Sequence, residues 1–244
     1  MKNQQLNLAD YFDSTYLKTA QEAGISKENE KEIVLEKIAE AIANNFACIM
    51  IRPEFVSQAK EIIETAKSKV KVGTVIDFPL GLGSTDQKLK QAKLAIAYGA
   101  YDLDFVADFN AFKRGSFEKF DEDIVKCTGL VLNSKKVVKW IIETGALSTG
   151  EIRNISKRIS KLVQTNFPQQ ANNVFIKTST GYYGGYGATL KDIKTIKSVA
   201  GNLQIKASGG VSTFNNCMEL LGAGATRIGT SKALFIFKQQ QPDF

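Results

Sequence analysis

Residues 173–185 read NVFIKTSTGYYGG, and residues 203–211 read LQIKASGGV. In each stretch a short apolar run ends in a lysine, Lys177 or Lys206, and a glycine turn follows. Burial beside an apolar run disfavours the ammonium form of a lysine, because the charge loses its hydration. A neutral amine is a nucleophile that forms Schiff bases with carbonyl substrates. The two strand ends therefore predict carbonyl chemistry, although a single lysine at such a position is more often a surface residue.

Short apolar runs alternate with longer amphipathic segments along the whole chain. Residues 28–43, for example, carry Ile33, Val34, Ile38 and Ile42 at nearly helical spacing. Eight strands alternating with about eight helices predict a single-domain (β/α)8 TIM barrel over residues 1–244. A doubly wound open sheet is the alternative, although no GxGxxG follows the first strand. Strands are expected at residues 11–16, 46–51, 71–76, 101–106, 136–142, 173–177, 203–206 and 226–229.

The composition excludes several classes of site. The chain has no histidine, so neither a Ser-His-Asp triad nor a His-ligated zinc site is possible. Its net charge of +7 comes from lysines interleaved with acidic residues, which indicates a solvated surface and no nucleic-acid partner. No segment is long and apolar enough to predict a membrane span, and the polar N-terminus lacks the apolar run of a signal peptide.

The cysteines and the C-terminus carry two further expectations. Cys48, Cys127 and Cys217 are odd in number and form no CxxC pair. They therefore indicate reduced thiols in a cytoplasmic protein. The polar residues at about 238–244 predict a short mobile tail, which could reach the mouth of the barrel.

Strand alternation brings a carboxylate to the two lysines. In residues 101–106, Asp102 and Asp104 point away from the apolar residues that would face the helices. Asp104, Lys177 and Lys206 can then all point into the barrel near its C-terminal mouth, where barrel enzymes keep their chemistry. Two ammonium groups about 5 Å apart repel each other by roughly 3 kcal/mol at an effective dielectric near 20. We therefore expect one lysine to be neutral, while Asp104 holds the charge of the other and relays protons.

Glycine turns follow the last three predicted strands, at residues 178–181, 208–211 and 229–231. Glycines allow backbone N–H groups to approach an anion closely. Barrels often bind phosphate in the loops after their last strands. The turns therefore predict a phosphate site, although ordinary strand-to-helix turns have the same composition.

These motifs together resemble the deoxyribose-phosphate aldolase family. The resemblance is strongest in FIKTSTG at 175–181, in IKASGGV at 205–211 with Thr213, and in ATRIGTS at 225–231. It extends to FDSTYLK at 12–18, GTVIDFPLG at 73–81, AIAYGAYDLDFV at 95–106 and KWIIETGAL at 139–147, so that it spans nearly the whole chain.

The resemblance implies a (β/α)8 barrel that needs neither metal nor organic cofactor. It implies a lyase that reversibly cleaves 2-deoxy-D-ribose 5-phosphate to D-glyceraldehyde 3-phosphate and acetaldehyde, and it suggests a homodimer. By position, Lys177 is similar to the Schiff-base lysine, Lys206 to its acid–base partner and Asp104 to the proton-relay carboxylate. The remaining implied residues are Asp13 near the second lysine, Thr180 and Cys48 at the substrate, and Gly181, Gly209, Gly210, Gly229 and Ser231 at the phosphate.

The chain departs from the family pattern at four positions. Ser212 stands where many members carry Arg, Ser14 where His is frequent, Asp77 where Gly is common, and Tyr182 follows TSTG. These differences leave room for a class I aldolase acting on a different phosphorylated sugar. A third alternative, suggested by the net charge, is a catalytically silent barrel that binds phosphorylated or nucleic-acid ligands.

Overall fold

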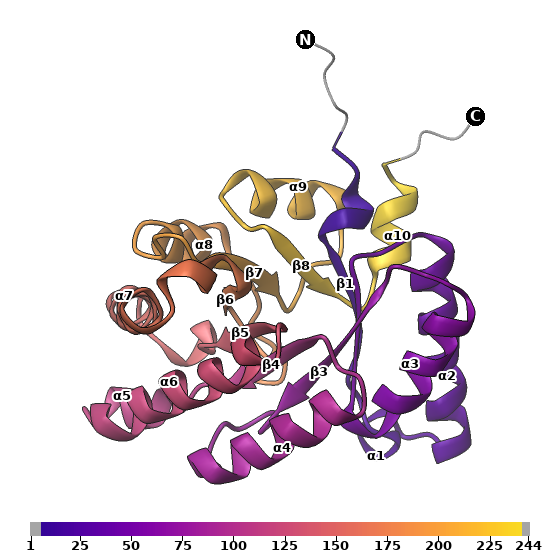
Figure 1. Ribbon diagram of the computed structural model, residues 1–244. Coiled ribbons are helices and arrows are strands. Elements are labelled where there is room, and N and C mark those ends of the chain that lie inside the picture. The colour runs from indigo at the N-terminus through magenta and orange to yellow at the C-terminus, as the bar shows by residue number, and fades with distance from the viewer. Residues whose placement is uncertain (1–5, 241–244) are drawn as a thin grey trace.

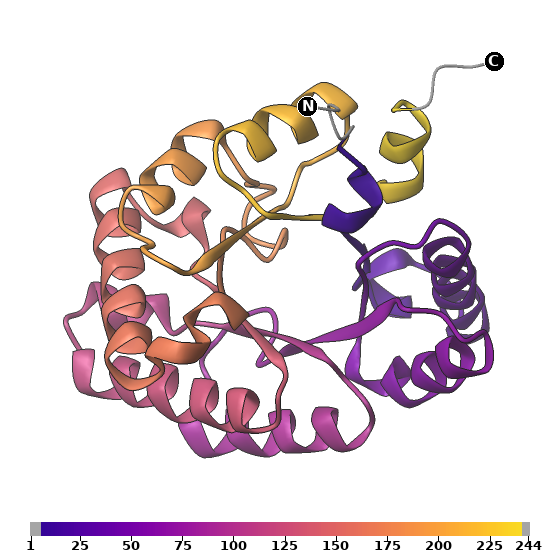
Figure 2. The same ribbon diagram turned by 45° about the horizontal axis from the view of Figure 1, so that its top comes forward.

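The protein forms a closed barrel of parallel strands enclosed by helices, as predicted (Figures 1 and 2). The computed structural model describes residues 6–240. Each strand pairs with its neighbours in the chain, and β1 closes the barrel against β8. The strands are β1 (Phe12–Tyr16), β2 (Cys48–Ile51), β3 (Lys71–Ile76), β4 (Asp102–Val106), β5 (Val137–Ile141), β6 (Val174–Lys177), β7 (Gln204–Ser208) and β8 (Arg227–Thr230).

Helices follow the strands and pack around the outside of the barrel (Figure 2). The α-helices are α1 (Ala20–Ala23), α2 (Lys27–Ala43), α3 (Val56–Thr65), α4 (Thr85–Ala97), α5 (Phe109–Lys113), α6 (Phe117–Asn133), α7 (Thr149–Asn166), α8 (Leu190–Lys197), α9 (Phe214–Gly222) and α10 (Ala233–Lys238). Short 3-10 helices occupy η1 (Leu8–Tyr11), η2 (Pro53–Phe55), η3 (Thr144–Ala146) and η4 (Pro168–Asn173). Within residues 6–240 no helix combines the length and hydropathy needed to cross a membrane.

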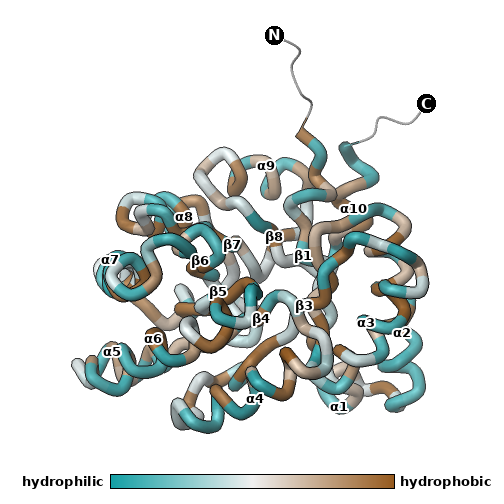
Figure 3. Tube along the Cα trace, viewed as in Figure 1, coloured by the Kyte–Doolittle hydropathy of each residue, from teal (hydrophilic) through white to brown (hydrophobic). Residues whose placement is uncertain are grey.

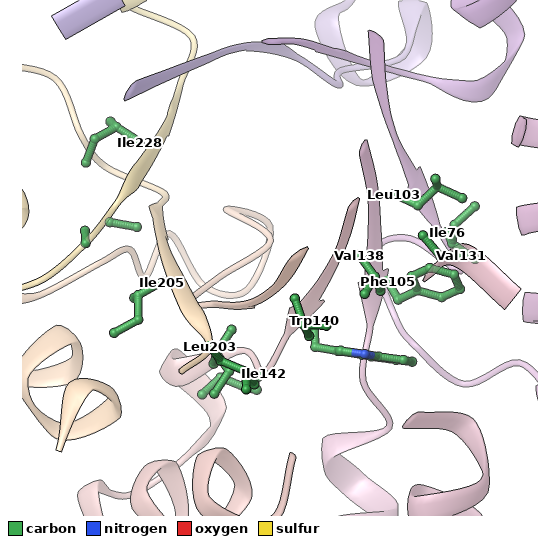
Figure 4. Close-up of a cluster of buried hydrophobic side chains, with 14 of the residues drawn as sticks. Ile76, Leu103, Phe105, Val131, Val138, Trp140, Ile142, Leu203, Ile205 and Ile228 are labelled. Carbon is green, nitrogen blue, oxygen red and sulfur yellow. The ribbon is translucent and has the colours of Figure 1, made fainter. Parts of the chain in front are cut away.

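The main hydrophobic core lies between the strands and the helices. Every second strand residue points outward into it, among them Leu103 and Phe105 of β4 and Trp140 of β5 (Figure 4). The Trp140 ring packs on Phe105 at 5.0 Å between centroids, and its Nε1 donates to Thr128 Oγ1 of α6 at 3.0 Å. Because these positions take the apolar residues, the alternate positions of the same strands face the barrel interior.

Helix α7 illustrates how the outer layer is built. Ser148 and Glu151 form a capping box that satisfies backbone N–H groups at its first turn. Its buried residues, which include Ile152, Ile155 and Ile159, recur at helical spacing and face the barrel. Hydrophilic and hydrophobic residues accordingly alternate along the outer helices in Figure 3. The amphipathic pattern is thus the local cause of the helical layer.

The predicted strands are all present, and no boundary differs from its prediction by more than two residues. The largest difference at the site is β7, which continues past Lys206 to Ser208. The first residues of the predicted mobile tail are held in place. Lys238 is the last residue of α10, and the Gln239 side chain accepts a hydrogen bond from Phe214 N at 3.0 Å. The Gln240 side chain accepts one from Leu8 N at 3.1 Å. Residues 241–244 of that prediction lie outside the described residues.

Candidate active site

A cavity of about 610 Å³ opens at the carboxyl ends of the strands, between β1 and the turns that follow β6, β7 and β8. Parallel strands bring their carboxyl ends to one rim, which is why residues far apart in the sequence meet here. Eight of the residues predicted from the sequence line it: Lys177, Thr180, Gly181, Lys206, Gly209, Gly210, Gly229 and Ser231.

The two predicted lysines meet at one carboxylate at the floor of this cavity. Lys177 and Lys206 are paired across β6 and β7. Their Nζ atoms donate to Asp104 Oδ2 at 2.9 and 2.8 Å, respectively. All three side chains are almost completely buried, with exposed fractions of 2% or less. The prediction from strand alternation that these side chains converge is therefore confirmed.

A third lysine, absent from the sequence prediction, lies beside them. Lys139 of β5 is fully buried, and its Nζ lies 2.5 Å from Asp102 Oδ2 and 3.1 Å from Asp104 Oδ1. It also lies 3.1 Å from Asp13 Oδ2, on the opposite side of the barrel interior. The outward apolar neighbours Val138 and Trp140 placed it inside, and that alternation is the signal that could have identified it.

Asp13 joins the same network from β1. Its Oδ2 lies 2.6 Å from Lys206 Nζ, and its Oδ1 accepts from Arg227 Nη1 of β8 at 2.8 Å. The predicted proximity of Asp13 to the second lysine is thus present in the structure. Arg227, a second cation that the sequence reasoning missed, also lies 3.8 Å from Asp102. Four cationic side chains therefore share three carboxylates in the barrel interior.

Burial in this cationic cluster makes Lys177 a much better nucleophile than a free lysine. Its pKa is lowered from 10.5 to about 8, first because burial removes water from the ammonium group and then because Lys206 and Lys139 repel it. Asp104 opposes the shift by attracting the ammonium form. At pH 7 about one molecule in ten has a neutral Lys177, against about one in three thousand at the ordinary value. Repulsion between lysines therefore contributes as predicted, but desolvation is the larger cause.

Asp104, Asp13 and Lys139 are held in their ionised forms by their neighbours. Burial alone would raise the pKa of Asp104, but the ammonium groups of Lys139, Lys177 and Lys206 hold it well below its usual range. The pKa of Asp13 is lowered in the same way, against its burial, chiefly by Lys139 and Lys206. Burial would lower the pKa of Lys139, but the surrounding carboxylates raise it well above its ordinary value. Lys177 is thus the lysine of this cluster whose lowered pKa favours loss of its proton, while the surrounding ion pairs remain charged.

The glycine turns at the rim depend on backbone freedom. Gly181 has φ 84°, Gly209 has φ 84° and Gly210 has φ 71°, which is the left-handed region that favours glycine. Gly229 is required for a different reason, because a Cβ there would lie 2.9 Å from Lys206 Cε. It leaves room for the Lys206 side chain as well as lining the cavity.

Two further lysines line the cavity near its rim, although sequence reasoning did not single them out. Lys18 follows β1 and Lys232 follows the turn after β8, and both side chains are exposed. Among residues 6–240 neither makes an ion pair, so their charge is not neutralised by a described carboxylate. Ser212, at the position where the resemblance suggested Arg, lines the same cavity.

Tyr182 forms an apolar part of the wall. Its ring packs edge-on against Phe78 at 5.0 Å between centroids, and its hydroxyl donates to Glu22 Oε2 at 3.4 Å. Arg52 lies over the other ring at 5.4 Å and pairs with the same Glu22 carboxylate at 3.3 Å. Tyr182, one of the differences from the family pattern, therefore takes no part in the ionic network. Its side chain instead connects the turn after β6 to the opposite rim of the cavity.

The expectation that Cys48 contacts substrate is not supported. Cys48 is fully buried inside the barrel, packs in an apolar cluster with Leu17, Met50 and Val75, and does not line the cavity. Its Sγ lies within 4.8 Å of carboxylate oxygens of Asp13 and Asp102, a grouping that could in principle ligate a metal ion. The fit is poor, because Lys139 already lies against both carboxylates and burial raises the pKa of the thiol well above its ordinary value.

Comparison with known proteins places the chain among aldolases. No family model matches it. A curated deoxyribose-phosphate aldolase from Staphylococcus saprophyticus is 39% identical over 239 residues, which cover 98% of this chain and 99% of that protein. Among solved structures, an aldolase named QR15 is 32% identical, with a TM-score of 0.77 and 96% of each chain covered.

A deoxyribose phosphate aldolase from Aeropyrum pernix, described as tetrameric, is 25% identical, with a TM-score of 0.76 over 95% of this chain and 90% of that one. The curated similarity extends over nearly the full length of both chains, and the barrel and its lysines agree with it. The chain belongs to the deoxyribose-phosphate aldolase family of lyases.

Proposed function

We propose that this protein cleaves 2-deoxy-D-ribose 5-phosphate reversibly to D-glyceraldehyde 3-phosphate and acetaldehyde, through a Schiff base on Lys177. The observation that carries the proposal is the Lys177 amine itself. It lies at the floor of the cavity, its pKa is lowered to about 8, and Asp104 Oδ2 lies 2.9 Å away. Lys139 contacts three carboxylates and Lys206 contacts two, Asp13 and Asp104, whereas Lys177 contacts Asp104 alone among the described residues, which makes Lys177 the better candidate nucleophile.

The neutral amine of Lys177 attacks the aldehyde carbon C1 of the open-chain sugar. The carbinolamine that forms loses water to give a protonated imine. Removal of the proton from the C3 hydroxyl then breaks the C2–C3 bond, which releases glyceraldehyde 3-phosphate and leaves an enamine. Protonation of the enamine at C2 and hydrolysis release acetaldehyde and restore the amine. Lys206 and Asp104, in contact at 2.8 Å, are the groups placed to exchange these protons through water.

The phosphate is proposed to bind at the rim, over the turns that contain Gly181, Gly209, Gly210 and Ser231. Backbone N–H groups alone leave most of a dianion's charge uncompensated. Lys18 and Lys232 line the same cavity, and among residues 6–240 they make no ion pair. We therefore assign them the role of countercharge, which makes the absence of Arg at position 212 tolerable.

Borohydride trapping tests the nucleophile directly. The protein is incubated with acetaldehyde and borohydride, and the reduced adduct is mapped by peptide mass spectrometry. We expect an adduct at Lys177 that is lost in the Lys177→Met variant. The control variant Lys126→Met, at an exposed lysine, should show the same adduct as wild type. Labelling spread over surface lysines, with no preference for Lys177, would refute the proposal.

The natural substrate is tested by turnover. Release of acetaldehyde from 2-deoxyribose 5-phosphate is compared with release of donor products from other phosphorylated sugars. A clear preference for the deoxy sugar supports the proposal, and a preference for a ketone donor supports the alternative class I aldolase.

Oligomeric state and location are also proposals. A homo-oligomer, with a dimer as the simplest case, is supported by the tetramer described for the Aeropyrum pernix relative. A cytoplasmic location is supported by Cys48, Cys127 and Cys217, all buried and unpaired as free thiols. Light scattering of the purified protein measures the first, and fractionation of the source cells measures the second.

A further inference from the structure

Glu143 has a strained backbone conformation and lies next to the turn that follows β6, the strand that carries Lys177. It follows β5 and has φ 55° and ψ 70°, a left-handed conformation that glutamate rarely adopts. Its side chain is 1% exposed and does not line the cavity. A buried acidic side chain on a strained backbone is costly, so its presence here points to a specific requirement for the carboxylate.

The carboxylate of Glu143 holds the turn that follows Lys177. Its Oε2 accepts two hydrogen bonds from Thr180, from the backbone N at 3.1 Å and from Oγ1 at 2.5 Å. Thr180 Oγ1 in turn accepts from the Tyr182 backbone N at 3.0 Å. Gly181, at φ 84° and on the cavity wall, lies between these two anchored residues.

The backbone around Glu143 reinforces the same connection. Thr144 N donates to Thr178 O at 2.9 Å, and the hydroxyls of Thr144 and Ser179 lie 3.3 Å apart. The turn of residues 178–181 is therefore tied along its length to the segment after β5. Of these ties, only those to Glu143 reach the glycine end of the turn, where the phosphate is proposed to bind.

We propose that Glu143 is a positioning residue that sets the affinity of the site for the substrate's phosphate by holding the turn of residues 178–181. The proposal rests on the phosphate site of the proposed function. This role accounts for the carboxylate at residue 143, whose Oε2 accepts both hydrogen bonds from Thr180. Without these bonds Gly181 would be free to move and would have to become ordered when the phosphate binds. The entropic cost of that ordering would weaken the affinity for the anion.

The test compares phosphorylated and phosphate-free substrates in Glu143→Ala, with the exposed Glu36→Ala as control. Hydrogen bonds to a charged group are worth about a factor of ten in binding. We expect the KM for 2-deoxyribose 5-phosphate and the Kd for inorganic phosphate to rise about tenfold, with kcat and the turnover of 2-deoxyribose within about threefold of wild type. Glu143→Gln, which keeps an acceptor oxygen, should recover most of the affinity.

A loss of kcat that is equal for both sugars, or an unchanged phosphate affinity, overturns the proposal. If Glu143→Ala does not fold, Thr180→Val removes the bonded hydroxyl and Thr180→Ser retains it, and only the first should weaken phosphate binding. Failure of the wild type to cleave the sugar would refute the proposed function alone, because the Kd for inorganic phosphate still decides the role of Glu143. A wild type that does not bind phosphate refutes the positioning role as well.

Discussion

Replacing Lys139 with methionine tests the ionic frame that sequence reasoning missed. The two side chains are similar in volume, so Lys139→Met removes the charge with little loss of packing. The ammonium group lies 2.5 Å from Asp102 and 3.1 Å from both Asp13 and Asp104. After its removal Asp104 still contacts Lys177 and Lys206, and Asp13 still contacts Lys206 and Arg227. Within the part of the chain that the structure describes, Asp102 then keeps only Arg227 as an ion-pair partner, at 3.8 Å.

The predicted magnitude follows from that single uncompensated carboxylate. Breaking a buried ion pair by removing one partner costs about 3–5 kcal/mol of unfolding free energy. We expect Lys139→Met to lose this amount in urea unfolding. The double variant Lys139→Met/Asp102→Asn removes the stranded charge as well, so it should lie within about 2 kcal/mol of wild type. A single variant within 1 kcal/mol of wild type, or a double variant less stable than the single one, would refute the reasoning.

The same variant has a chemical readout. Lys139 repels the ammonium form of Lys177, so its removal favours that form and raises the pKa of Lys177 above about 8. Borohydride trapping by Lys139→Met should therefore require a higher pH than trapping by wild type. An unshifted pH profile in a folded variant would mean that Lys139 is only structural.

The other predictions concern the nucleophile, its neighbour and the rim. Trapping by wild type should rise about tenfold per pH unit and level off above the Lys177 pKa of about 8, because only the neutral amine reacts; a profile that is flat from pH 6 to 9 would contradict this. Gly229→Ala should lower kcat more than tenfold, since its Cβ would meet Lys206 Cε at 2.9 Å. Lys18→Gln and Lys232→Gln should each raise the KM for the phosphorylated sugar several-fold, less so at high salt, and leave 2-deoxyribose unaffected.

Much of the site could be predicted because strand alternation is a local property. In β4 the apolar Leu103 and Phe105 point outward to the helices, so Asp104 between them points into the barrel. The same alternation turns the lysines of β6 and β7 inward. The rule applied equally to Lys139, which was overlooked because no glycine turn follows it directly. Cys48 shows the limit of motif position: alternation turns it inward, but the depth at which it lies keeps it out of the cavity.

The sequence by itself predicted the fold and the convergence of Asp104, Lys177 and Lys206, because the periodicity of apolar residues is a property of the chain alone, and its motifs indicated the family. Closure of the barrel decided the rest. It brought Asp13 of the first strand to Lys206 and Arg227 of the last two, and set Glu143 behind Thr180. Distances between residues more than 200 positions apart, and the desolvation that lowers the pKa of Lys177, exist only when the chain is folded.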